Sequence, residues 1–466
     1  MQLVAYGAQD IYLTGNPQIT FFKIVYRRHS NFAIEAIEQT LNGNADFNRR
    51  VSCTISRNGD LIHRVYLQTS LPQVTAEGGC VRWVDNVGHF LMKNYEIEIG
   101  GQRIDKHYNH WLEIWYQLTI PAGQKEGYKK MIGQSPASLR VPQQSQPATR
   151  LYIPFQAWFC RNVGLALPLI ALQYHEVKIN IEFEALNKLV IVDAPVEGGC
   201  GTGSVAPASL PDASIFVDYI FLDTEERRRF AQVSHEYLIE QLQFTGEESF
   251  NSTSLKSRLN FNHPVKELVW TVQTAAVEAA HEWNNYTTCP VGIVACPVDG
   301  QCPTPADPVA EFTFGGVCED GSVGTNPVDK AKIQLNGHDR FQERDGSYFN
   351  LVQPYQHHTN IPDSPGINVY SFGLRPEEHQ PSGTVNMSRI DNATLWLNCS
   401  PAVQEGAKLR VFATNYNVLR IMSGMGGLNK LIRAKKQYAI VKQPLTIENH
   451  FAVAFKSQGK LLVSVY

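Results

Sequence analysis

The sequence is poor in charged residues. Asp, Glu, Lys and Arg make up 18% of its 466 residues, whereas soluble proteins typically carry about a quarter. The 41 basic and 44 acidic residues nearly cancel, for a formal charge of −3, and proteins that package nucleic acid are usually strongly basic. We therefore expect no direct contact with nucleic acid, and we expect a partner to cover part of the surface.

The sequence also lacks the usual signals for membrane insertion and secretion. It has no run of about 18 uncharged apolar residues, and its first residues show no basic segment followed by an apolar one. Nine cysteines are an ordinary number for this length, so we expect free thiols in a reducing compartment. The N-x-[ST] sequences are therefore interpreted as incidental. They begin at Asn251, Asn285, Asn386, Asn392 and Asn398.

Motifs of catalysis and cofactor binding are missing as well. There is no GxxxxGK[ST] phosphate loop and no GxSxG nucleophile elbow. The pairs His235-Glu236 and His281-Glu282 lack the second histidine of a zinc-protease helix. The glycine-rich residues 424–427 are interpreted as a turn. We therefore predict that the protein is not an enzyme and that it binds no cofactor and no metal.

Two groups of histidines could supply metal ligands by residue type. His107, His110 and Glu113 would share one face of a helix, but the tryptophans beside them favour a packed aromatic helix. The adjacent His357 and His358 would point to opposite faces of a strand. Neither group is therefore predicted to bind a metal.

The sequence is rich in two-residue alternation of apolar and polar side chains, which is typical of strands with one buried face. Frequent glycine and proline, 34 and 25 residues, favour short strands joined by turns. Strands are predicted at residues 177–183, 215–221, 268–272 and 395–397. The dipeptides Gly100-Gly101 and Asn336-Gly337 predict two hairpins, because both tolerate positive φ.

A faint internal repeat accompanies the two hairpins. They lie 236 residues apart (101 to 337), and each is followed by an aromatic-rich segment. Tyr152 and Tyr370 each precede a predicted strand by 25 residues, at an offset of 218. Two similar β units therefore fit the length better than three unrelated domains. The join is expected near residues 213–232, where Asp223 can cap a short helix.

Three long segments rich in Pro, Gly, Gln or Ser are predicted to be loops: residues 119–150, 192–214 and 284–330. The last of them contains four cysteines, whose intervals do not match the close CxxC pairs of structural zinc sites. Free thiols, one or two disulfides formed by oxidation, and a metal site remain as alternatives. The four residues are Cys289, Cys296, Cys302 and Cys318.

Five segments together resemble the major capsid proteins of nucleocytoplasmic large DNA viruses, of the iridovirus and marseillevirus type. They occur in a consistent order from residue 5 to residue 428. They are AYGAQDIYLTGNPQITFF (5–22), LPLIALQYHEVKI (167–179), YIFLDTEERRRFAQVSHEYLIEQLQ (219–243), SFGLRPEEHQPSGTVNMSRIDNATLWL (371–397) and FATNYNVLRIMSGMGGL (412–428).

The resemblance implies an all-β fold of two consecutive eight-stranded antiparallel jelly rolls, with long loop insertions and a short linker helix. The implied boundaries are an N-terminal arm at 1–26, a first jelly roll at 27–213, a linker at 214–232, a second jelly roll at 233–430 and a C-terminal extension at 431–466. The second jelly roll would contain the long insertion near 284–330.

The resemblance also implies a homotrimer that forms a pseudo-hexagonal capsomer and tiles the icosahedral shell of a large DNA virus. The implied partners are neighbouring capsomers, minor capsid and penton proteins, and an internal lipid membrane nearby. The protein would be made and assembled in the host cytoplasm and end in the virion. The alternative is a carbohydrate-binding or cell-attachment β-sandwich protein, because jelly rolls also build lectins.

The N-terminal arm is expected to act in assembly. Its residues Gly7, Gly15, Asn16 and Pro17 favour an extended, turning strand over a helix. The arm would then be an inward-facing assembly element, and the alternative is a simple edge strand of the first barrel.

Overall fold

A computed structural model describes residues 7–22, 24, 26–77, 79–134, 142–196, 199–202, 204–290, 323–428, 455–457 and 460–462. Residues 1–429 form one compact unit, and residues 430–466 form a second. In the second unit, strands β27 (Phe455–Ser457) and β28 (Lys460–Leu462) pair antiparallel. The rest of the C-terminal extension lies outside the described residues.

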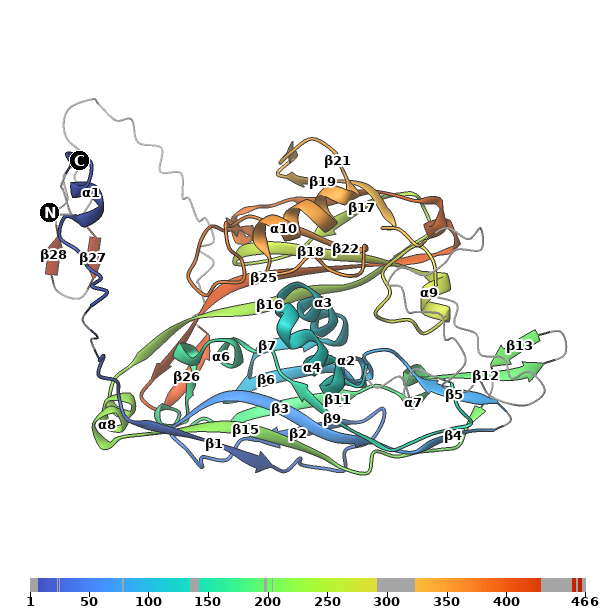
Figure 1. The fold of residues 1–466 in the computed structure, drawn as a ribbon, viewed down its shortest axis with the longest axis horizontal. Coiled ribbons are helices and arrows are strands. Elements are labelled where there is room, and N and C mark those ends of the chain that lie inside the picture. Colours follow the sequence, from blue (N-terminus) through green and yellow to red (C-terminus); the bar gives the residue numbers. More distant parts are fainter. Residues whose placement is uncertain are drawn as a thin grey trace, which may run out of the picture. The chain divides into compact units, whose positions relative to one another are not determined.

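The first half of the larger unit contains two antiparallel sheets that enclose a hydrophobic core (Figure 1). One sheet has the order β1-β15-β3-β10, with β9 also paired to β3, and the other has the order β2-β11-β6-β7. Their strands are β1 (Phe32–Gln39), β2 (Arg50–Thr54), β3 (Leu61–Leu71), β6 (Met92–Ile99), β7 (Gln102–Tyr108), β9 (Thr149–Pro154), β10 (Leu167–Pro168), β11 (Val177–Phe183) and β15 (Ala213–Leu222).

Two small sheets extend this half, with the orders β13-β12-β5 and β14-β4-β8. Their strands are β4 (Val74–Glu77), β5 (Cys80–Trp83), β8 (Ser145–Gln146), β12 (Val190–Val196), β13 (Gly199–Thr202) and β14 (Ser204–Val205). Strands β12, β13 and β14 occupy part of residues 192–214, so the prediction of a loop there is wrong. Strand β12 pairs with β5, and β14 pairs with β4. Pairing with strands so distant in the chain leaves no local pattern in the sequence.

The second half contains another two antiparallel sheets around its own core. One has the order β16-β25-β18-β22, with β23 and β26 at its margins, and the other has the order β17-β24-β19-β20, with β21 paired to β19. Their strands are β16 (His235–Phe250), β17 (Ser254–Leu259), β18 (Pro264–Thr274), β19 (Val328–Leu335), β20 (His338–Asp339), β21 (Arg344–Asp345), β22 (Ile367–Ser371), β23 (Val385–Asn386), β24 (Ala393–Cys399), β25 (Ala407–Met422) and β26 (Met425–Leu428).

The two halves share one strand order. We number the principal strands of each half from 1 to 8 along the chain: β1, β2, β3, β6, β7, β9, β11 and β15 in the first, and β16, β17, β18, β19, β20, β22, β24 and β25 in the second. Both halves then have sheets of order 1-8-3-6 and 2-7-4-5. The expected double jelly roll is therefore confirmed, and the two predicted hairpins are equivalent, since each joins principal strands 4 and 5.

Helices occur mainly in the connections between strands. They are α1 (Ile11–Thr14), α2 (Val87–Leu91), α3 (Asn109–Thr119), α4 (Ala122–Ile132), α6 (Trp158–Arg161), α7 (Leu186–Leu189), α8 (Thr224–Gln232), α9 (Ala275–Ala279) and α10 (Gln353–His357), with a π-helix η3 (Tyr348–Val352) directly before α10. Short 3-10 turns are η1 (Val163–Leu165), η2 (Leu169–Ala171), η4 (Met387–Arg389) and η5 (Pro401–Glu405). Helix α4 lies in residues 119–150, which the sequence predicted to be a loop.

The predicted linker is correct in its helix but wrong in its extent. Asp223 caps α8, because its side chain accepts a hydrogen bond from the backbone N–H of Glu226. Residues 214–222, however, belong to β15, which pairs with β1 and β3 in the first barrel. The first jelly roll therefore extends beyond residue 213, and the alternation of residues 215–221 was the signal of its last strand.

Candidate assembly site between the two halves

Helix α3 joins the two halves through a shared hydrophobic core. The helix belongs to the first half, and its residues Trp111, Ile114, Trp115 and Leu118 recur at the spacing of one helix face. They pack in one cluster with side chains of the second half. These are Leu242, Val269, Tyr286, Ile367, Val369 and Phe412. Because burial of large apolar side chains is the main favourable term in packing, the cluster holds the two barrels together as one unit.

The other side of α3 packs against the first half. Leu112 belongs to the core of the first barrel. Tyr116 stacks on Tyr128 of α4, with ring centroids 5.0 Å apart and planes 12° from parallel. Helix α3 is therefore apolar on both faces because it lies between two packed layers, and α4 helps to cover it.

A buried carboxylate fixes the position of α3. Glu113 accepts hydrogen bonds from Asn86 Nδ2 at 2.9 Å and Gln117 Nε2 at 2.9 Å, and its Oε2 lies 2.8 Å from His89 Nδ1. The Gln117 side chain in turn accepts a hydrogen bond from the backbone N–H of Ser364, at 3.1 Å. Glu113 therefore anchors a chain of contacts that reaches from the first half to the second.

The trio His107, His110 and Glu113 does not form one group. His107 lies on β7, not on the helix, and its ring contacts Tyr95 Oη at 2.8 Å and the Asp105 carboxylate at 2.9 Å. The His110 ring lies 3.1 Å from Tyr286 Oη, and burial lowers its pKa well below 6.5. Among the described residues, no group of three potential ligands could hold a metal ion.

A buried arginine lies at the same interface. Arg410 of β25 donates to Glu247 at 2.8 Å, to Gln273 at 2.9 Å and to Glu278 at 3.0 Å. Although burial alone would raise it, the pKa of Glu247 is lowered by Arg410 and Lys408. All three acceptors belong to the second half, so the guanidinium links β16, β18 and α9 there through two carboxylates and one amide.

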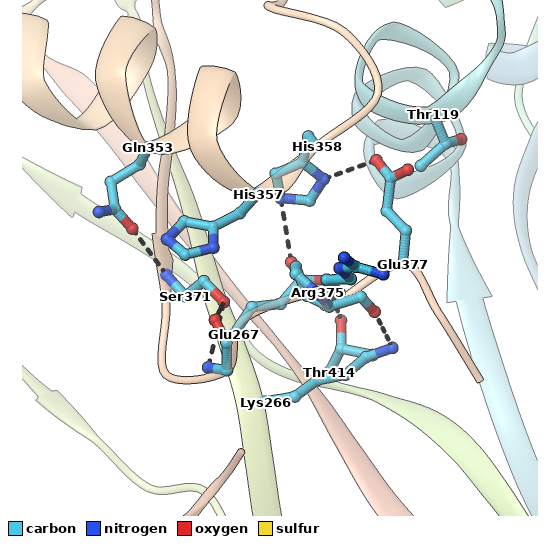
Figure 2. Close-up of polar contacts among 12 residues, drawn as sticks. Thr119, Lys266, Glu267, Gln353, His357, His358, Ser371, Arg375, Glu377 and Thr414 are labelled. Carbon is cyan, nitrogen blue, oxygen red and sulfur yellow. Dashed lines mark hydrogen bonds and ion pairs between the residues drawn. The ribbon is translucent and has the colours of Figure 1, made fainter. Parts of the chain in front are cut away.

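A second charged cluster surrounds His358, immediately after α10 (Figure 2). Its Nε2 lies 3.2 Å from Glu267 of β18, and its Nδ1 lies 2.8 Å from Glu377. Burial alone would lower the pKa of His358, but its ion pair with Glu267 and its hydrogen bond to Glu377 raise it to about 9. Because the residue follows a helix, the prediction that His357 and His358 lie on opposite faces of a strand is wrong.

The His358 cluster holds the loop that carries Glu377. Thr359 donates to the Glu377 carboxylate from its backbone N–H at 3.0 Å and also from its hydroxyl. Lys266 donates to the backbone carbonyl of Pro376 in the same loop. Both Glu267 and Lys266 come from β18, so this strand fixes the loop against the barrel (Figure 2).

The charged cluster also reaches the first half. Lys266 Nζ lies 2.7 Å from Glu240 Oε1, and Arg161 Nη1 of α6 lies 2.9 Å from Glu240 Oε2. The Arg161 guanidinium lies 4.6 Å from the Trp115 ring centroid on α3. These residues were not predicted from the sequence, although one signal was present: Lys266 and Glu267 directly precede the predicted strand 268–272, where buried charge is unusual.

The described residues of the N-terminal arm are exposed, except for Asp10, which is half-buried. The N–H of Gly7 donates to the Asp10 carboxylate at 2.7 Å, Gly15 ends α1, Asn16 has a φ of 50°, and Pro17 follows. The expectation of an extended arm is therefore wrong at Ile11–Thr14, where the chain forms one helical turn. The large apolar side chains described in the arm are also exposed. The backbone of residues 7–22 does not pair with any strand of the barrels.

Of the four predicted loop cysteines, the structure describes one. Cys289 is buried and disulfide-bonded, whereas Cys296, Cys302 and Cys318 lie outside the described residues. Cys80, which the sequence did not single out, is also disulfide-bonded. In the part of the chain that the structure describes, no helix is long and apolar enough to cross a membrane.

Two family models match the chain, one over each half. The model described as "Major capsid protein N-terminus" matches residues 20–223, and the model described as "Large eukaryotic DNA virus major capsid protein" matches residues 226–427. The short gap between the two matches falls where α8 begins.

Individual relatives match almost the whole chain. The major capsid protein of Phaeocystis pouchetii virus is 50% identical, over 92% of this chain and 98% of the relative. That of Paramecium bursaria Chlorella virus 1 is 45% identical over the same shares. A solved structure from the capsid of the latter virus is 40% identical with a TM-score of 0.68, covering 88% of this chain and 99% of that one.

Proposed function

Because the chain belongs to the major capsid proteins of large eukaryotic DNA viruses, a family of structural proteins and not of enzymes, we propose that three copies close into a pseudo-hexagonal capsomer. Such capsomers tile the icosahedral shell of the virion. The function is bonding between copies, with no substrate turnover.

The observation that carries this proposal is the repeated strand order of the two halves. Three copies of a chain with two equivalent barrels present six similar units around one axis. A ring of this kind needs heterologous contacts, in which one surface of a copy meets a different surface of the next and the rotation closes. Obligate interfaces of that kind commonly bury about 2,000–5,000 Å² in total, which agrees with the low share of charged residues.

The mass of the purified protein in solution tests the proposal. Light scattering coupled to size exclusion should give about three times 52.3 kDa, and averaged electron micrographs of the same fraction should show a hexagonal outline. A protein that remains at 52.3 kDa at high concentration would refute the trimer.

We further propose that the arm, residues 1–22, acts after the trimer has formed. Its exposed apolar side chains and its lack of strand pairing within residues 7–22 support a contact with something outside the barrel. Deletion of residues 1–22 should leave the trimer mass unchanged and prevent shell formation. Normal shells from the deleted protein would exclude an assembly role.

The loop with Cys289, Cys296, Cys302 and Cys318 is proposed to project outward and to be stapled by oxidation. The disulfide bond of Cys289 supports this proposal. Peptide mapping of intact particles under non-reducing conditions should recover disulfide-linked peptides from residues 284–330. Complete alkylation of these four thiols without prior reduction would contradict it.

The remaining partners of a capsid subunit are proposed on the same basis. They are neighbouring capsomers, minor capsid and penton proteins, and an internal lipid membrane close to the shell, with assembly in the host cytoplasm and no direct nucleic-acid contact. Purified shells analysed by cross-linking mass spectrometry would identify the protein contacts. The carbohydrate-binding alternative is not proposed, since the named relatives are capsid proteins.

A further inference from the structure

Helix α3 makes a contact between the two similar halves, and each partner in that contact has an equivalent in the other half. Helix α3 follows principal strand 5 of the first half and covers the outer face of the second half's 1-8-3-6 sheet. At the centre of that face, Val269 of β18 pairs with Phe412 of β25 on one side and Val369 of β22 on the other. The Trp111 ring of α3 lies 5.5 Å from the Phe412 ring.

The second half has a helical segment at the equivalent position. Residues 348–357, which form η3 and α10, follow principal strand 5 of that half. Phe349 anchors the segment in its own core, but Leu351, Val352 and Tyr355 are exposed by 48%, 39% and 76%. Leu374 is 73% exposed, and its backbone carbonyl lies 2.9 Å from His357 Nδ1 at the end of the segment. We call these four residues the helix patch.

The first half has a sheet face equivalent to the one that α3 covers. Tyr66 of β3 pairs with Phe216 of β15 on one side and Pro154 of β9 on the other. Principal strands 3, 8 and 6 thus place Tyr66, Phe216 and Pro154 where the second half has Val269, Phe412 and Val369. Tyr66 and Phe216 stack with centroids 5.3 Å apart, and Tyr152 packs beside them at 6.4 Å.

This aromatic face is not fully buried in the isolated chain. Tyr66 and Phe216 are half-buried, and Tyr152 is 36% exposed. The contact at α3 joins a helix of one half to a sheet face of the other. Each chain exposes a second pair of such surfaces: an apolar helical segment on the second half and an apolar sheet face on the first. In a closed ring of copies arranged head to tail, each of these two surfaces can be covered by the other surface of a neighbouring copy.

We propose that the helix patch of one copy packs on the Tyr66–Phe216 face of the next copy, so that the contact within each chain is repeated between chains. The inference rests on the trimer proposed above and assigns its interface. Three internal and three intersubunit contacts of one type then surround the threefold axis.

Charged side chains of both signs lie beside the two apolar surfaces: Arg375 pairs with Glu378 at 3.0 Å next to the helix patch, and the exposed Arg150 lies on the same side of β9 as Tyr152. Arg344 and Arg375 are exposed next to the helix patch, and Arg344 lies 4.2 Å from the ring of Tyr348. On the sheet face, Glu38 of β1 is paired with Phe216, and Asp218 follows on the same side of β15.

The His358 cluster prepares the helix patch for this contact. His358 is fixed at the end of α10 by Glu267, and Glu377 holds the loop that carries Leu374 (Figure 2). Because these anchors are already formed in the isolated chain, little ordering is left to occur on association, which lowers the cost of binding.

Two tyrosines with equal exposure provide a matched test. Tyr355 belongs to the helix patch and Tyr174 does not, and each is 76% exposed. Tyr355→Asp should raise the concentration of half-dissociation of the trimer at least tenfold, whereas Tyr174→Asp should change it less than twofold. Circular dichroism and thermal unfolding of the monomers serve as the check that both variants fold.

A photoreactive phenylalanine analogue at position 355 identifies the surface that is contacted. In wild-type-like trimers it should cross-link between copies, to peptides that contain Tyr66, Tyr152 or Phe216. Cross-links to other peptides, together with unchanged dissociation of the Tyr355→Asp trimer, would overturn this interface while the trimer itself stands. A wild-type protein that is monomeric would instead refute the proposed function.

Discussion

The pairing of His358 with two carboxylates leads to a prediction about pH. The two carboxylates raise the pKa of this buried histidine from 6.5 to about 9, a shift of roughly 2.5 units, and each unit corresponds to about 1.4 kcal/mol. Because the pKa is raised in the folded state, the stabilisation is fully present below pH 6.5 and is lost as the pH rises toward 9. Because the unfolded histidine is half protonated at pH 6.5 and the folded one at pH 9, the loss between these two pH values is about 2.6 kcal/mol, or roughly a hundredfold in a local opening equilibrium.

Hydrogen exchange measured by mass spectrometry is the appropriate assay, because the loop at residues 372–383 can open locally while the barrel stays folded. After correction for intrinsic exchange rates, protection of this loop should fall about a hundredfold between pH 6.5 and pH 9. In His358→Gln the pH dependence should disappear, and protection should be lower at pH 6.5 because Glu267 loses its buried partner.

The neighbouring histidine supplies the control. His357 contacts the backbone carbonyl of Leu374 and no carboxylate in the hydrogen bonds described, so His357→Gln should keep the wild-type pH dependence of loop protection. If wild type and His358→Gln show parallel pH profiles, the argument that His358 is held charged by its two carboxylates is refuted.

Three further substitutions test other parts of the structure. Gly366→Ala should prevent the normal approach of β22 to Tyr286, because a Cβ atom there would lie 1.6 Å from the Tyr286 carbonyl oxygen; soluble yield and thermal unfolding should both fall, and wild-type values would contradict the packing. Trp111→Ala should cost about 3–5 kcal/mol by leaving a cavity beside Phe412, measured by denaturant unfolding, and a cost below about 1 kcal/mol would show that α3 does not hold the halves together. Asp223→Ala should cost about 1 kcal/mol through loss of the α8 cap, while Asp223→Asn should retain most of it in the same assay; equal losses in the two variants would exclude capping as the cause.

Local sequence patterns were reliable where one strand or turn determines the outcome. Gly100 and Gly101 have φ values of 57° and 80°, and Asn336 and Gly337 have values of 51° and 81°, so both hairpins were identified from the residues that tolerate them. The weak repeat was also meaningful, since Tyr152 and Tyr370 lie on β9 and β22, the sixth principal strand of each half.

Patterns that depend on distant partners were misinterpreted. The His107, His110 and Glu113 spacing suggested one helix face, but the chain leaves β7 only at Tyr108, so His107 belongs to a sheet. The segment with α4 was predicted to be a loop because it is polar, yet Tyr128 and Ile132 are buried against the first half. Their burial depends on packing with Tyr116 of α3, and the residues of α4 alone do not indicate this contact.

Local patterns in the sequence determined that the chain is rich in strands, where the two hairpins lie and where the helix cap lies, because alternation and turn chemistry act between residues that are close along the chain. The double jelly roll was expected from the resemblance to a known family, and the internal repeat only hinted at it. The tertiary structure alone decided how the halves are joined. Trp111 of the first half meets Phe412 of the second. Within the second half, His358 meets both Glu267 and Glu377, which are far from it along the chain. The helix patch and the Tyr66–Phe216 face remain exposed, because they do not meet each other within one chain.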